Sequence, residues 1–551
     1  MPSFNGIRVR RSIESIYDDY LIGQKFGKPE LQKPLNDLIR AWVGITKLDH
    51  TDPNSFFNIG GLHGEPFRGA GYSSAAWWGG WCNHGNVLFP TWHRAYCLRL
   101  EDALRSIPGC EDVALPYWDE TGTQTAENGV PQIFLEKQFQ LDGKFIENPL
   151  YSYKFPQNIV DNIASDNSLY SKHEGYDTVR YPFSGLVGTQ EAREATLAHN
   201  RTYYEATDPT ANQLLSDNVK AWLQNGRWEN GSWVGGVGVR QKYVNCLEAP
   251  NYTVFSNTTS AQSWNDNTPP EKQVTPLEAP HNDIHLAVGG FDIPGQPDFD
   301  LIPGANGDMG ENDTAGLDPI FFFHHCFVDR QFWLWQVKQN STEALELIAE
   351  YPGTNSVDSQ GPTPGVAGGT WLTLKSPLQP FTKPSKDTER VYYTSNDVVN
   401  IETQLGYAYD APGSGKKLLT PLPAATHATH SVRISGLNKN NIAGSHQLVV
   451  YGLFPGEKSR RVLAVESVLS RWHVSGCKNC QTTADVKRYA HLYGIPDGLE
   501  AIPGSKNRDG NALQLDVEVV TREGSGPGKG EPPLKPIVKV VRSGKKYSDV
   551  L

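Results

Sequence analysis

The segment Asp318–Trp335, with the sequence DPIFFFHHCFVDRQFWLW, constrains the fold of this chain most strongly. Its residues are almost all apolar or aromatic, and a helix that is apolar on every side is buried. The segment also carries two adjacent histidines, His324 and His325. A buried imidazole needs a partner because an unpaired polar group inside a protein costs roughly 1–3 kcal/mol. The segment therefore predicts a buried helix whose histidines have partners elsewhere in the chain.

Three histidines in the N-terminal part of the chain are candidates for one metal site. His63 lies in a glycine-rich loop, His84 lies in a second loop, and His93 lies in the first turn of a helix predicted over residues 91–107. Two loops and a helix can bring their side chains to one point. Each histidine alone is a weak signal, because most such residues are surface residues.

A second trio comes from His281, His285 and His325. His281 and His285 are four residues apart, which places them on one face of a helix that starts near Pro280. Imidazole-only sites suit Zn, Cu, Fe or Ni, and three imidazoles leave a coordination position open for catalysis. The alternatives are satisfied core histidines, or a two-zinc hydrolase that uses Glu278 or Asp283 as a bridging carboxylate.

The composition excludes several classes of protein. The 551 residues carry a net charge of −11 without a basic stripe, which argues against nucleic acid as a partner. No apolar run approaches the ~18 residues of a membrane span. The seven cysteines are an odd, sparse set, which indicates reduced thiols. The N-terminus lacks the apolar run of a secretory signal, so we expect an intracellular, cytoplasmic protein.

The pattern along the chain predicts an α+β protein. Within the first 410 residues, helical periodicity marks residues 12–46 and 91–107, and residues 115–245 are loop-rich. Residues 411–430 are rich in Pro, Gly, Ala and Thr and indicate an exposed linker. Alternating segments over residues 431–520 predict a β-sandwich-like second domain. Residues 521–551 form a tail rich in Gly, Pro and Lys, with one possible strand over residues 536–541.

The histidine motifs together resemble the two copper-binding regions of the tyrosinase family, the type 3 copper proteins, and most closely those of fungal polyphenol oxidases. The motifs are HGEPF, C-x-H-G-N-V-L-F-P-T-W-H-R-A-Y, H-N-x-x-H and D-P-I-F-F-F-H-H-x-x-V-D-R. The resemblance covers residues 7–409, and beyond residue 431 only the strand pattern and the pair Cys477/Cys480 are shared. It implies a mainly α catalytic domain, in which a central four-helix bundle holds two copper ions.

This resemblance implies an enzyme that uses O2 to ortho-hydroxylate monophenols and to oxidise ortho-diphenols to ortho-quinones, in pigment or secondary metabolism. The alternative is a catechol or ortho-aminophenol oxidase without hydroxylation, and an O2 carrier is a further rival. A homo-oligomer is left open. The implied copper ligands are His63, His84 and His93 for copper A, and His281, His285 and His325 for copper B.

The family pattern also assigns roles around the coppers. Cys82 would form a thioether with His84, unless it is a free buried thiol. Phe321 would pack between the coppers, and Leu286 would tune substrate access. Glu278 and Asn282 would hold a water that accepts the phenol proton, unless they are only a helix-start charge and a surface amide.

The same resemblance predicts a latent enzyme whose C-terminal domain covers the copper pocket. The candidates for a side chain that enters the pocket are Phe454 and the segment Leu469–Val474, and cleavage near Lys416-Lys417 would release it. Cys477 and Cys480 would deliver Cu(I), unless they are a structural or redox pair. Two further contacts are expected: Arg10 or Arg11 with Tyr407 and Tyr409, and Asp329 either with His325 or with an arginine.

Overall fold

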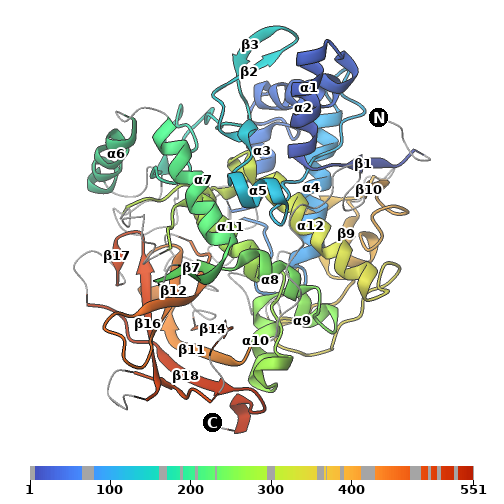
Figure 1. The fold of residues 1–551 in the computed structure, drawn as a ribbon. Helices are drawn as coiled ribbons and strands as arrows, with labels where there is room; N and C mark the ends of the chain where they lie inside the picture. Colours follow the sequence, from blue (N-terminus) through green and yellow to red (C-terminus); the bar gives the residue numbers. More distant parts are fainter. Residues whose placement is uncertain are drawn as a thin grey trace.

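A computed structural model gives the arrangement of the chain. It describes residues 6–64, 80–160, 171–185, 190–204, 209–229, 232–293, 304–355, 365–367, 369–384, 390–410, 428–471, 485–493, 495, 498–504, 511–526 and 532–549. Helices dominate the first three quarters of the chain, and the strands after residue 430 gather beside them, in orange and red at the lower left of Figure 1. The α+β fold predicted from the sequence is confirmed.

The N-terminal helical stretch is two helices, α1 (Ile13–Phe26) and α2 (Pro29–Lys47). Gly27 ends α1 in the left-handed conformation with φ 64°, which glycine adopts without the strain other residues incur. Pro29 then starts α2, where its fixed φ suits a first helical turn. The predicted single stretch over residues 12–46 is therefore broken by a cap that its hydrophobic pattern did not show.

Four helices form the core of the helical part: α2, α4 (Phe89–Arg105), α11 (Glu278–Gly289) and α12 (Ile320–Lys338). α4 packs on both α2 and α12, and α12 also contacts α11. The first thirteen residues of α12 are all buried, as its composition predicts. α4 and α11 each begin two residues before the predicted start, and Pro90 and Pro280 lie within their first turns.

Shorter elements surround this bundle. They are β1 (Arg8–Arg10), α3 (Phe56–Gly60), α5 (Thr123–Asn128), β2 (Gln138–Leu141), β3 (Lys144–Glu147), β4 (Ile159–Val160), β5 (Ser171–Lys172), α6 (Gln190–Tyr204), α7 (Pro209–Leu223), β6 (Asn225–Glu229), β7 (Ser232–Val237), α8 (Val239–Cys246), α9 (Tyr252–Ser256), α10 (Thr258–Asp266), the 3-10 turn η5 (Asp308–Gly310), β8 (Pro377–Thr382), β9 (Tyr392–Thr394) and β10 (Tyr407–Tyr409).

The C-terminal part is built from two sheets. One has the strand order β14-β11-β18, and the other has the order β13-β12-β16-β15 with β17 paired to β16. The strands are β11 (His430–Asn438), β12 (His446–Leu453), β13 (Arg461–Val468), β14 (Asp485–Leu492), β15 (Ala501–Pro503), β16 (Leu513–Thr521), β17 (Gly524–Ser525) and β18 (Ile537–Arg542). Apolar residues from both sheets share one core, and the possible tail strand is confirmed as β18.

Phe454 packs against this C-terminal core, and the Arg461 guanidinium lies 5.4 Å from its ring centroid. The prediction that Phe454 enters the copper pocket is therefore wrong. The residue follows β12 directly, and its apolar ring is partly buried against the C-terminal core where that strand ends.

Charged residues join the sandwich to the helical part. Lys242 on α8 donates to Glu466 on β13 at 3.1 Å and lies 3.0 Å from Asp283 on α11. Arg433 and Lys487 both bind Asp266 at the end of α10. The strands therefore lie against the same helix α11 that carries His281 and His285. In the described part of the chain, no helix combines the length and apolar character needed to cross a membrane.

The two ends of the helical part meet in a parallel pair of strands, β1 and β10. The Arg10 guanidinium lies 3.6 Å from the Tyr407 ring centroid, which confirms the expected cation–π contact. Asp329 on α12 accepts hydrogen bonds from Arg94 at 2.5 Å and from the Tyr407 and Tyr409 hydroxyls at 2.6 Å each. Of the two partners considered for Asp329, the structure therefore has arginine and not His325.

Replacing Asp329 by Asn should destabilise the protein by about 3–5 kcal/mol, because it leaves the buried Arg94 without its counter-ion. Burial opposes ionisation of Asp329, but Arg94 and Arg10 outweigh it and hold the pKa of this carboxyl below its usual value. Its stabilisation is thus fully present above the unfolded pKa of ~3.9 and is lost as the pH falls through the folded value.

Thermal unfolding at pH 7, 5 and 3 checks this expectation: the gap in Tm between wild type and Asp329→Asn should be constant from pH 7 to 5 and shrink at pH 3. Asp142→Asn is the control, because Asp142 belongs to an exposed ion pair with Arg40. An Asp329→Asn protein as stable as the control would contradict the prediction.

Candidate active site

The first histidine trio is assembled by α4 and the two loops before it. His63 follows α3, His84 precedes α4, and His93 lies one turn into α4. Their ring centroids are 5.1–5.7 Å apart, and all three side chains are buried. The loops and the helix therefore converge as their sequence pattern predicts.

The second trio is tighter. The Nε2 atoms of His281, His285 and His325 lie 3.1, 3.2 and 3.3 Å from one another. α11 presents the first two from successive turns, and α12 brings the third across the bundle. A point equidistant from the three nitrogens is roughly 1.9 Å from each, close to the ~2.0 Å of a metal–imidazole bond.

Hydrogen bonds on the far side of the rings show that lone pairs converge at this point. His285 Nδ1 is 2.7 Å from the Met309 carbonyl oxygen, so this nitrogen carries the proton and donates it. His281 Nδ1 likewise faces the Asn282 side-chain oxygen at 3.0 Å. Their Nε2 atoms are then acceptors, and acceptors cannot hydrogen-bond one another. A cation is what such an arrangement accommodates.

The first trio has the same chemistry. His63 Nδ1 donates to the Asn312 carbonyl at 3.1 Å, and His93 Nδ1 donates to the Phe89 carbonyl at 2.8 Å. Among the described residues, the buried Nε2 atoms of these two histidines and both ring nitrogens of His84 have no hydrogen-bond partner. Buried polar atoms without partners are rare, so this trio also suits a metal.

The two trios face each other directly. The His93 and His325 rings stack with centroids 4.5 Å apart, and those of His84 and His281 are 5.7 Å apart. The Phe321 ring lies 4.0 Å from His325 and 4.8 Å from His63, so it touches both trios. Two metal ions held here would be neighbours.

Burial keeps all these imidazoles neutral. Desolvation lowers the pKa of His93 to about 3 and holds the pKa of the other ligand candidates well below the usual value of a histidine, for example His63 and His285. Neighbouring imidazoles lower it further, because one cannot be charged beside another. At neutral pH the rings therefore offer lone pairs, the form that binds a metal.

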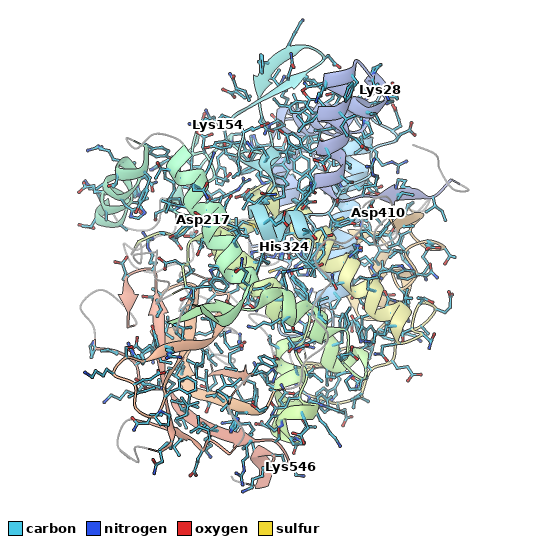
Figure 2. The ribbon with its side chains drawn as sticks, viewed as in Figure 1. Lys28, Lys154, Asp217, His324, Asp410 and Lys546 are labelled. Atoms are coloured by element: carbon cyan, nitrogen blue, oxygen red, sulfur yellow. The ribbon has the colours of Figure 1, made fainter. Side chains whose placement is uncertain are left out.

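His324 lies beside the second trio and is labelled at the centre of the molecule in Figure 2. Its Nδ1 is 2.5 Å from Glu120, and the Tyr243 hydroxyl donates to the other oxygen of that carboxyl group at 2.6 Å. The family resemblance leaves His324 outside the ligand set, and no sequence pattern predicts Glu120 or Tyr243 as its partners. No spacing connects those two residues to the histidine motifs, so only the folded chain identifies them.

The remaining predicted site residues also lie near the histidines. Glu278 accepts from the backbone of Gly85, directly after His84, at 2.7 Å and from Thr258 at 2.8 and 2.9 Å. Asn282 is buried against His281, so it is not a surface amide. Leu286 is fully buried in the hydrophobic core.

Cys82 provides a sulfur within 4.8 Å of ligand nitrogens of His63 and His84. Burial raises the pKa of its thiol to about 11. The thioether to His84 stays a prediction, since no contact tests it. Cys477, Cys480 and the cleavage site at Lys416-Lys417 lie outside the described residues.

Comparison with known proteins identifies relatives of this arrangement. Residues 53–338 match the model of the common central domain of tyrosinase. The chain is 50% identical to tyrosinase HcTyr2 of Hahella sp. (strain CCB-MM4), over 88% of each chain, and 47% identical to a tyrosinase of Aspergillus oryzae, over 84% of this chain and 87% of that one. The solved tyrosinase of Burkholderia thailandensis superposes with a TM-score of 0.79 and 44% identity, covering 97% of this chain and all of that one.

Replacing His285 by Ala should lower the copper content from two ions per chain to one or fewer, because two imidazoles remain where three converge. Mass spectrometry of metal content on the purified protein measures this. His173→Ala is the matched control, since His173 is exposed and outside both trios. Two coppers retained by His285→Ala would contradict the assignment of the second trio.

Proposed function

The chain belongs to the tyrosinase family of type 3 copper proteins, and from that premise we propose that His63, His84 and His93 hold one copper ion while His281, His285 and His325 hold the other. The enzyme ortho-hydroxylates monophenols and oxidises ortho-diphenols to ortho-quinones with O2. When bound, the copper pair supplies the redox chemistry that activates O2. The converging Nε2 lone pairs of the second trio are the observation that carries this proposal.

The protein keeps the donor set rigid and dry. Four of the six imidazoles are fixed by hydrogen bonds from Nδ1, three of them to backbone carbonyls, so their rings cannot rotate away from the metal. Phe321 and Phe89 pack against histidines of both trios and exclude water from around the rings. The imidazoles are therefore already oriented before substrate binds, which limits the reorganisation needed during oxidation.

Hydroxylation of a monophenol requires that its proton be removed. A phenol has a pKa of ~10, so ionising it near pH 7 costs about 4 kcal/mol without help. Glu278 is the proposed proton acceptor, acting through a water that Asn282 also holds. Desolvation raises the pKa of this buried carboxyl, which makes it a stronger base, and the oxygen that accepts from Gly85 has a further lone pair beyond that bond.

A catechol or ortho-aminophenol oxidase without hydroxylation is the second candidate, because oxidation of a diphenol does not need this base. Oxygen uptake and quinone absorbance on tyramine and on catechol distinguish the two. Turnover of both substrates by the copper-loaded protein supports the proposal. Turnover of catechol alone favours the second candidate, and binding of O2 without turnover would leave only a carrier.

Replacing Glu278 by Gln should lower kcat on the monophenol on the order of 10²-fold relative to kcat on the diphenol, because the amide cannot accept the proton. The matched control is Glu14→Gln. Glu14 is a buried carboxyl on α1, away from the histidines, that accepts hydrogen bonds from the backbone N–H of Asp119 and the hydroxyl of Thr125. Both variants are assayed after copper content has been checked. An equal fall on the two substrates would argue that Glu278 only maintains the structure.

We further propose three functional regions: a catalytic domain over residues 1–410, a linker over residues 411–430, and a shielding domain over residues 431–520 followed by the tail. Support comes from Arg471, after β13, which donates to Asp313 at 3.0 Å and to the carbonyl of Gly64 beside His63 at 3.5 Å. Of the predicted segment Leu469–Val474, Arg471 therefore contacts residues beside the first trio, and residues 472–474 are not described.

Cleavage within residues 411–430 should increase kcat/KM for bulky phenols, because the shielding domain can then leave the rim. A site for a sequence-specific protease placed at residues 416–417 allows the same protein to be assayed before and after digestion, with the wild type, which lacks that inserted site, treated identically. Unchanged activity after complete cleavage and separation of the fragments would refute latency.

A further inference from the structure

One short segment serves both histidine trios. The carbonyl of Met309 accepts from His285 of the second trio, and the carbonyl of Asn312 accepts from His63 of the first trio. We call residues 308–313 the strap. Only two residues lie between Met309 and Asn312, so a displacement of the strap moves one imidazole in each trio. Neither carbonyl has a sequence signature.

The strap lies in close backbone contact with the elements that carry these histidines. A Cβ on Gly289, at the end of α11, would lie 1.8 Å from the Gly310 nitrogen. A Cβ on Gly64, next to His63, would lie 2.0 Å from the Asn312 oxygen. Glycine at both positions permits this approach, which sets the hydrogen-bond distances to the two imidazoles.

The side chain of Asp308 anchors the strap to the catalytic domain. Its oxygens accept four hydrogen bonds: from Lys172 Nζ at 2.6 Å, the Tyr176 hydroxyl at 2.7 Å, the Val179 backbone at 2.8 Å and the Thr314 hydroxyl at 2.8 Å. The carboxylate is fully buried. A buried charge with this many donors is held in one position.

Lys172 is the cation of this anchor and is itself fully buried. Its ammonium also lies 3.5 Å from Glu311 on the strap, so one charge faces two strap carboxylates. The residue sits on β5, far in sequence from every histidine of the site. A lysine is rarely buried this completely unless its charge is paired.

We propose that Lys172 is a positioning residue for the dicopper site, acting through the strap on one imidazole of each trio. The inference rests on the proposed function, because it concerns the retention of the two coppers. Loss of the ammonium leaves the Asp308 and Glu311 carboxylates buried side by side without their cation. The strap then shifts, and His63 and His285 lose the acceptors that orient them.

Removing a group that orients a metal ligand typically lowers metal affinity 10–100-fold. Lys172→Met, which keeps the length of the side chain without the charge, should therefore release copper at a 10–100-fold lower concentration of a Cu(I) chelator such as bathocuproine disulfonate. Because the strap serves both trios, the two coppers should be lost together. The titration is performed on folded holoprotein, well below its Tm.

Arg10→Met is the matched control. Arg10 is an equally buried cation paired with Glu101, and it contacts neither trio nor the strap. It should lower Tm while copper release stays within about twofold of wild type. A Lys172→Met protein that behaves like this control, with lower Tm and normal copper retention, would overturn the proposal.

A second variant covers the case in which Lys172→Met does not fold. Lys172→Met/Asp308→Asn removes one charge of each sign, so the net charge of the buried cluster is the same as in the wild type. Weak retention of both coppers in this folded double variant supports a positioning role, and wild-type retention overturns it. Wild-type protein that binds no copper at all would instead refute the proposed function, so the two failures are distinguishable.

Discussion

The structure depends on burying six neutral imidazoles so that their lone pairs converge. Desolvation prevents protonation of the imidazoles, and hydrogen bonds from Nδ1 orient rings such as those of His63 and His285. The second trio would be unfavourable without a cation, because acceptor nitrogens at 3.1–3.3 Å repel. The helix bundle, the aromatic packing and the strap all hold the six imidazoles in this arrangement.

Charge pairing inside the helical part also holds the imidazoles in place. Asp329 ties α12 to α4 through Arg94, and Asp308 ties the strap to β5 through Lys172. Both carboxylates are buried and accept several donors, so each is held in one position. The sandwich joins the same framework through Lys242, which lies between Asp283 and Glu466. The site is thus connected to regions distant in sequence.

Much of the site was predictable because metal ligands leave local patterns. The i, i+4 spacing of His281 and His285 follows from helix geometry, and the apolar segment around His325 required burial. The alternating segments after residue 430 gave strands for the same kind of reason. Phe454 was misplaced because an aromatic residue on a turn can face either of two cores, and local sequence does not say which.

The sequence by itself determined the chemistry: which residue types are present, which of them share a helix face, and that the helix of His324 and His325 is buried. Only the tertiary structure decided the support around it, including Glu120 on His324, Arg94 on Asp329 and Lys172 beneath the strap. The physical reason is that ligand spacing is a local property of the backbone, whereas a buried charge is matched by whichever residue the fold brings near. Backbone carbonyls, which orient three of the rings, are the same in every residue and become specific only through position.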